Sequence, residues 1–106
     1  MNEESAEALR ARLNAETGRI NWAELAPHFA RGAVVHVAQG LDLVEVAACF
    51  VEDRRDQVQA WMDEGRIAAA TDDDARTWTK NPPAFLAVVA APWVLVQPVT
   101  ESVSGR

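Results

Sequence analysis

The chain has 106 residues, 49% of them hydrophobic, and a single cysteine. This length supports one domain with its own core, and the lone cysteine excludes an internal disulfide framework. The formal charge of −6, from 10 basic and 16 acidic residues, disfavours non-specific binding to nucleic acids or anionic membranes. Because the N-terminus lacks the apolar segment of a signal peptide, we expect a cytoplasmic protein. We expect one domain over residues 1–106, with a frayed tail at 99–106.

Two helices and a short strand are expected in the first third of the chain. The segment 3–17 has alanines and two leucines at helical spacing, a narrow apolar stripe that requires this helix to dock on another element. A second helix is expected after Asn21, because Asn21 and Glu24 have the spacing of a capping box. Pro27 lies inside this helix and predicts a kink or two short turns. The β-branched segment 33–37 predicts a strand.

The central stretch 41–67 has the pattern of two helices joined by a tight turn. Asp42 and Glu45 are spaced as a capping box for the first helix. Asp53 is placed to cap the second helix, and Gly65 fits the left-handed position that ends it. Two helices followed by an extended segment give the outline of a helix-turn-helix that leads into a wing.

The last third predicts a weak strand, a short polar segment and a long apolar strand. The strand at 67–70 is followed by Thr71 and Asp74 in capping-box positions, which indicate a short helix or an elaborated wing. The segment 85–96 is the most apolar of the chain, and its β-branched residues predict a strand that is covered on both faces. Pro92 either splits this run into two strands or occupies a bulge or an edge position.

Together these elements predict an α+β, winged-helix-like fold. It would contain N-terminal helices, a helix-turn-helix-like pair and a small antiparallel sheet that ends in the long apolar C-terminal strand, placed between the two earlier strands. One face of that strand would pack against the apolar residues of the helices: Trp22, Leu25, Phe29, Val46, Phe50, Val58 and Trp61. Its other face would be covered by the N-terminal helix or by a second copy of the chain. Trp78 lies in the polar segment, so we expect it to be partly exposed.

Several short motifs carry a family resemblance. They are the segments 21–25, 29–32 and 41–47, Trp61 with 65–67, and 92–97. With these motifs, which span most of the chain, the sequence resembles a family of short bacterial proteins known as domain of unknown function 2288. The resemblance implies a bacterial, cytoplasmic protein, and it implies no activity and no functional residues.

The sequence specifies no biological role, and it favours a protein-interaction or self-association module. The motivating features are the doubly apolar final segment, the acidic surface and the lack of recognisable catalytic motifs. A homo-oligomer or a protein partner is therefore expected, and a membrane is not. The residues that we expect at such an interface belong to the final apolar segment: Trp93, Leu95, Phe85, Leu86 and Val88.

A winged-helix nucleic-acid-binding protein is the alternative. The second central helix would enter the major groove and present Arg54, Arg55, Gln57 and Gln59, which are suitable side chains for reading bases. However, the stretch 41–67 contains three arginines against seven acidic residues. Counterion release requires clustered cations, so we expect Arg54 and Arg55 to be a solvated helix start.

An enzyme with a site near His28 and His36 is the second alternative. Cys49 is the remaining candidate for chemistry, and its place beside the apolar face of a helix predicts a buried, inert thiol. These residues have no spacing typical of metal ligands, and the sequence has no recognisable phosphate-binding loop or nucleophile elbow. We therefore expect no catalytic residues, no metal and no cofactor.

Overall fold

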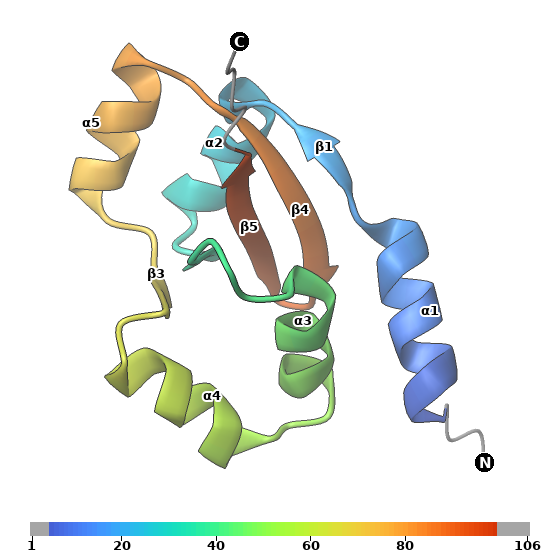
Figure 1. Ribbon diagram of the computed structural model, residues 1–106. Coiled ribbons are helices and arrows are strands. Elements are labelled where there is room, and N and C mark those ends of the chain that lie inside the picture. Colours follow the sequence, from blue (N-terminus) through green and yellow to red (C-terminus); the bar gives the residue numbers. More distant parts are fainter. Residues whose placement is uncertain (1–4, 100–106) are drawn as a thin grey trace, which may run out of the picture.

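The computed structural model describes residues 5–99 and shows a mixture of helices and strands, which confirms the α+β class (Figure 1). In chain order the elements are α1 (Ala6–Glu16), β1 (Gly18–Ile20), α2 (Trp22–Ala30), β2 (Val34–Val37), α3 (Leu43–Val51), α4 (Arg55–Asp63), β3 (Ile67–Ala69), α5 (Asp72–Lys80), β4 (Ala84–Ala90) and β5 (Trp93–Val99). Among residues 5–99, no helix combines the length and hydrophobicity needed to cross a membrane. Apart from Val99, which ends β5, the predicted tail lies outside the described residues.

The strands form one mixed sheet in the order β1-β4-β5-β2-β3. All neighbouring pairs are antiparallel except β2 and β5, which are parallel. The winged-helix arrangement is not confirmed, because β2 and β3 are direct neighbours and the last strand lies outside that pair. Two further features complete the sheet. Pro92 lies in the turn that divides the apolar run into the β4–β5 hairpin, which was one of the two expected outcomes, and Gly18–Ile20 adds an edge strand that we did not predict.

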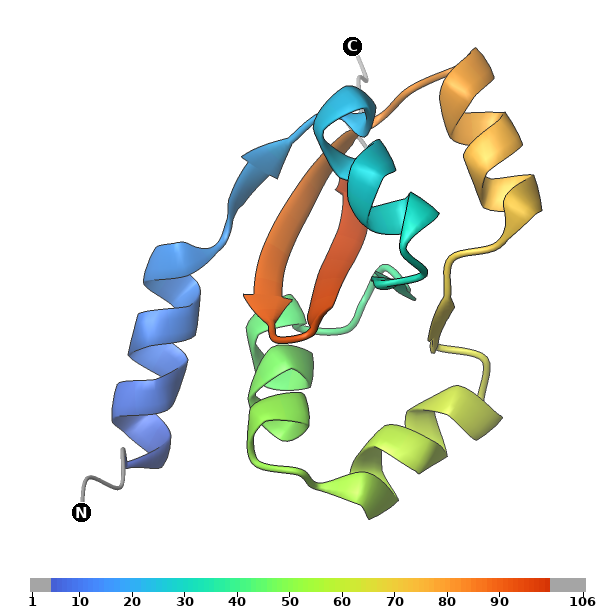
Figure 2. The same ribbon diagram turned by 180° about the vertical axis from the view of Figure 1, so that it is seen from behind.

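Helices of the chain itself cover both faces of the sheet. On one face, α1, α3 and α4 pack over a cluster that includes Leu13, Val46 and Leu95, and α3 is seen in front of the sheet in Figure 1. On the other face, α2 and α5 pack over a cluster that includes Leu25 and Phe85, and α2 is seen in front in Figure 2. The predicted core residues are therefore divided between two faces, and the chain's own helices cover the apolar hairpin except at Val89 and Trp93, which remain exposed.

Aromatic rings fill the cluster under α2 and α5. The Trp78 ring lies 4.9 Å from Phe85 and 5.6 Å from Trp22, measured between ring centroids. The Trp22 Nε1 donates a hydrogen bond of 3.1 Å to Thr79 Oγ1. The prediction that Trp78 is partly exposed is wrong, because Trp78 is only 5% exposed. The acids of α5 lie in its first turn, where the helix dipole favours them, whereas Trp78 comes later in the helix and packs against Trp22 and Phe85.

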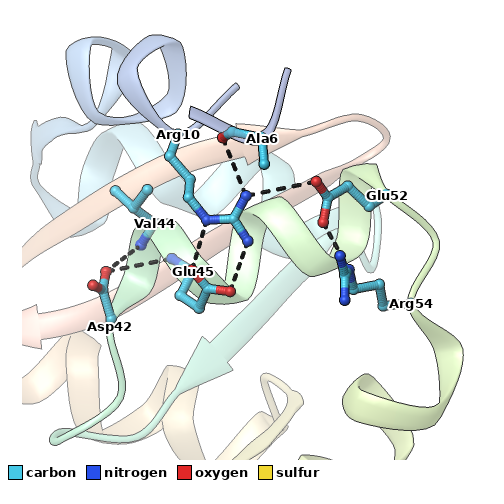
Figure 3. Close-up of polar contacts among 7 residues, drawn as sticks. All are labelled: Ala6, Arg10, Asp42, Val44, Glu45, Glu52 and Arg54. Carbon is cyan, nitrogen blue, oxygen red and sulfur yellow. Dashed lines mark hydrogen bonds and ion pairs between the residues drawn. The ribbon is translucent and has the colours of Figure 1, made fainter. Parts of the chain in front are cut away.

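An ion-pair network attaches α1 to α3 (Figure 3). The Arg10 guanidinium donates two hydrogen bonds of 2.8 Å to the two carboxylate oxygens of Glu45, and its Nη1 lies 3.6 Å from Glu52 Oε2. Asp42 caps α3 by accepting from the backbone N–H of Val44 and Glu45. The predicted capping box at this helix is thus half formed, because the Glu45 carboxylate binds Arg10 instead of returning to the cap.

The helix ends show which local signals hold. The capping boxes at Asn21 and Thr71 are both complete, and α2 remains one helix through Pro27. Asp53 does not cap α4; it adopts a left-handed conformation with φ of 58° and its carboxylate accepts a hydrogen bond from Arg55. The chain therefore turns between α3 and α4 at the left-handed Asp53, and α4 begins without a side-chain cap.

Replacing Leu13 by Ala tests whether α1 is a structural part of the domain. Leu13 is fully buried, so we expect L13A to lower the free energy of unfolding by about 2–5 kcal/mol. Urea denaturation followed by circular dichroism measures this change. Ala11→Gln on the exposed side of α1 is the control and should change stability by less than about 0.5 kcal/mol. Equal effects of the two changes would contradict the docking of α1.

The Arg10–Glu45 contact predicts a pH dependence of stability. Hydrogen bonding from Arg10 lowers the pKa of Glu45 below its ordinary value of 4.5. Because the folded-state pKa is lowered, the stabilisation is present above pH 4.5 and is lost as the pH falls through the folded-state pKa. We expect Glu45→Gln to be less stable than the wild type at pH 7, and the difference to shrink towards pH 3. Glu7→Gln on α1 is the control, and a gap that stayed constant with pH would refute the ion pair.

Candidate binding site

Exposed apolar side chains gather where α4 faces the end of the sheet. Within the described residues, the large exposed hydrophobic side chains include Met62, 49% exposed, and Trp93, 38% exposed. Both line a hollow of about 180 Å³, which we call the apolar groove. The groove is lined by Val35, Phe50, Val58, Met62, Ile67, Ala68, Ala69 and Trp93. Met62 and Trp93 are thus neighbours in one depression and not isolated surface residues.

The groove exists because α4 is incompletely packed. Val58 and Trp61 pack against the core cluster but stay partly exposed. None of the residues of α4, all of which lie in the described part of the chain, is buried. The apolar face of α4 is only three residues wide (Val58, Trp61 and Met62), and the small residues Ala68 and Ala69 of β3 line the groove beside it. Small residues beneath a narrow helix face leave a space that larger residues would have filled.

The β4–β5 turn places Trp93 in the wall of this groove. Trp93 is the first residue of β5 and pairs with Ala90, the last residue of β4. Because side chains alternate along a strand, Trp93 lies on the same face of the sheet as Leu95, which belongs to the cluster under α3. Val94 points to the opposite face and belongs to the cluster under α2 and α5. The register of the hairpin therefore decides which face receives the indole ring.

A second hollow of about 430 Å³ adjoins the apolar groove, and we call it the arginine hollow. The two share Phe50, Val58 and Trp93 in their walls. The arginine hollow also contains Arg54 and Arg55. Arg54 Nε donates a hydrogen bond of 2.8 Å to Glu52 Oε1, and Arg55 Nε donates one of 3.1 Å to Asp53 Oδ1. The charges at this rim are therefore largely balanced within the turn between α3 and α4.

The structure separates the residues that we predicted for an interface. Phe85, Val88 and Leu95 are buried inside the chain, and Leu86 is partly buried. Trp93 alone of the five predicted residues is exposed. The sequence reasoning missed Met62 as a surface residue because it assigned the apolar face of α4 to the core. The signal that could have found it is the narrowness of that face in a helix that is otherwise polar.

The residues predicted to contact nucleic acid lie at the start of α4. Arg54 and Arg55 are held by neighbouring carboxylates, as described above. Gln59 Nε2 donates a hydrogen bond of 2.8 Å to Asp63 Oδ1, and Gln57 is exposed beside the arginines. Three of these four side chains therefore bond to acidic residues of their own segment. This arrangement does not form the clustered positive charge on which phosphate binding depends.

The three candidates for catalysis do not form one site. Cys49 is buried on α3, on one side of the sheet. His36 lies on the other side, with its ring 5.4 Å from that of Trp78. His28 lies on α2, where its Nδ1 is 2.7 Å from Arg31 Nη2. Among residues 5–99, no group of three or more His, Cys, Asp or Glu side chains is placed to hold a metal ion.

Comparison with known proteins identifies relatives whose function is not described. The model of a family described as "Protein of unknown function (DUF2288)" matches residues 8–98. The chain is also similar to the NMR solution structure of PA1075 from Pseudomonas aeruginosa, with 42% sequence identity and a TM-score of 0.79. That match covers 100% of this chain and 97% of the other. No curated protein matches the sequence.

Cys49 provides a chemical test of the packing beside the arginine hollow. Burial raises the pKa of the Cys49 thiol, and only the thiolate reacts rapidly with alkylating reagents. We expect iodoacetamide at pH 8 to modify Cys49 at least about tenfold more slowly in the native protein than in urea. The control is an Ala11→Cys, Cys49→Ser double variant. Its thiol lies on the exposed side of α1 and should react quickly in both conditions. Equal native rates for the two proteins would contradict the burial of Cys49.

Proposed function

Since the chain belongs to the DUF2288 family, for which no function is described, we propose a function from the geometry of its surface: it is a protein-interaction module that binds through the apolar groove. The observation that carries this proposal is the pairing of exposed Trp93 and Met62 across one hollow. Tryptophan is enriched among the residues that contribute most to binding energy at protein interfaces. Methionine is flexible and polarizable, and it is common on binding surfaces that adapt to their partners.

The surroundings of the groove fit a protein ligand. The arginine hollow adjoins it and supplies polar groups on one side of the apolar centre, and protein interfaces commonly combine a hydrophobic core with polar residues at its edge. The predicted homo-oligomer is one form of this proposal, because a second copy could present the partner surface. The groove replaces the sheet face as the proposed contact, since the helices of the chain already cover most of both faces.

Site-specific photo-crosslinking tests the proposal. A benzophenone amino acid placed at Met62 should form adducts with a partner in the cells that make this protein. The yield should fall when Trp93 is replaced by Lys, because the charge opposes burial of an apolar partner in the groove. The matched control is the same probe at Val89, which is 55% exposed and lies on the face of the sheet opposite Trp93 according to the strand alternation.

The size of the adduct identifies the form of association. Adducts of twice the chain mass at Met62 would support self-association, and light scattering over a concentration series should then show a dimer. Adducts of another mass would support a separate partner. Equal yields at Met62 and Val89, or no adduct at Met62, would refute the groove as a protein-binding surface. Thermal unfolding of each variant verifies that the fold is retained.

A further inference from the structure

The groove opens beside a strand whose outer edge is unpaired within residues 5–99. The strand order places β3 at the end of the sheet, next to β2. Ala38 N donates to Arg66 O and Ala70 N donates to Val34 O. Hydrogen-bonded residues alternate along an antiparallel pair, so Ala68 also faces β2. The backbone N–H and C=O groups of the intervening residues Ile67 and Ala69 consequently point away from β2. Ile67 is only 2% exposed, so the accessible outward groups are those of Ala69, which is exposed.

This edge has only one of the usual protections against strand addition, its short length. Natural edge strands are commonly kept very short or blocked by charged side chains, proline or bulges. The opposite edge, β1, carries the exposed Arg19 at its centre. β3 is equally short, but its residues Ile67, Ala68 and Ala69 carry no charge and include no proline, and both alanines are exposed. Their small side chains allow another backbone to approach closely.

We propose that β3 accepts an extended segment of a partner protein as an added strand, with one aliphatic side chain of that segment in the apolar groove. This inference rests on the proposed function. Residues directly opposite one another in an antiparallel pair share a face of the sheet. Ile67 and Ala69 both line the groove. A partner residue hydrogen-bonded to Ala69 therefore directs its side chain to the face that the groove occupies. Backbone bonds supply affinity in this mode of binding, and the groove supplies specificity.

The charge around β3 selects the ends of the segment. Figure 1 shows β3 between α4 and α5. The acidic residues on its two sides are Asp63, Glu64, Asp72, Asp73 and Asp74. Arg66 offsets Glu64, and Arg76 bonds to Asp73, which leaves the surroundings of the strand negative. The complementary segment has an aliphatic centre and a basic residue at each end.

The size of the site favours a short segment over a second folded copy. A stable protein–protein interface involves roughly 20–30 residues on each side. The proposed contact consists of a three-residue strand edge and one hollow of about 180 Å³. This surface matches an extended peptide that inserts one side chain, and it is too small to hold two domains together.

The test uses a capped peptide, Lys-Thr-Val-Thr-Leu-Thr-Val-Thr-Lys, and the ¹⁵N-labelled full chain. On titration we expect chemical-shift changes at the amides of β3 and at the indole of Trp93. Ala69→Pro removes an outward N–H but none of the bonds between β2 and β3, and it should weaken binding about tenfold. Ala69→Ser keeps the N–H and is the matched control. Met62→Lys, at an exposed position, tests the groove separately and should also weaken binding.

Several results would overturn this inference. They are the absence of shifts at β3, equal binding of a peptide with Glu at both ends, and β3 shifts that depend on protein concentration without peptide, which would indicate a second copy as the occupant. The crosslinking experiment distinguishes the two proposals. If Ala69→Pro leaves adducts at Met62 unchanged, the groove binds its partner without the strand edge, and this inference fails while the proposed function stands.

Discussion

Burial of the apolar β4–β5 hairpin is the constraint on which the rest of the structure depends. Both faces of this hairpin carry hydrophobic residues, such as Leu95 on one side and Phe85 on the other. A sheet with two apolar faces requires a layer of helices on each side. The chain meets this requirement with α1 and α3 on one face and α2 and α5 on the other. The remaining helix, α4, lies at the end of the sheet, and its apolar face is only partly covered. The proposed binding surface lies there.

Local signals were predictable, and signals that depend on tertiary partners were not. The capping boxes at Asn21 and Thr71 involve side chains three residues apart, so the sequence suffices to locate them. The box at Asp42 is only half formed, because Glu45 binds Arg10 on α1, a helix that is distant in sequence. The strand at Gly18–Ile20 was missed because three residues with a central arginine show no alternation. The family was recognised from motifs, and the match over residues 8–98 confirms it.

The candidate site was predictable only in part, for a physical reason. Trp93 could be identified because it begins an apolar strand after Pro92, a residue typical of turns and edges. Met62 could not be distinguished from a core residue, since its exposure depends on how closely α4 approaches β3. Trp78 was misjudged in the opposite direction, because its burial depends on the rings of Trp22 and Phe85. In each case the periodicity gives the face of a helix but not the depth at which that face is packed.

The parallel pairing of β2 with β5 also has a consequence for the order of folding. Val34 pairs with Val94, and most of the chain lies between them, whereas β4 and β5 are joined by a tight turn. Closing a long loop loses more chain entropy than closing a hairpin, and such non-local pairing slows folding. We expect the hairpin to form early and to dock on β2 late. During that interval both its apolar faces are open to solvent, so the nascent chain is most prone to aggregation before β2 and β5 meet.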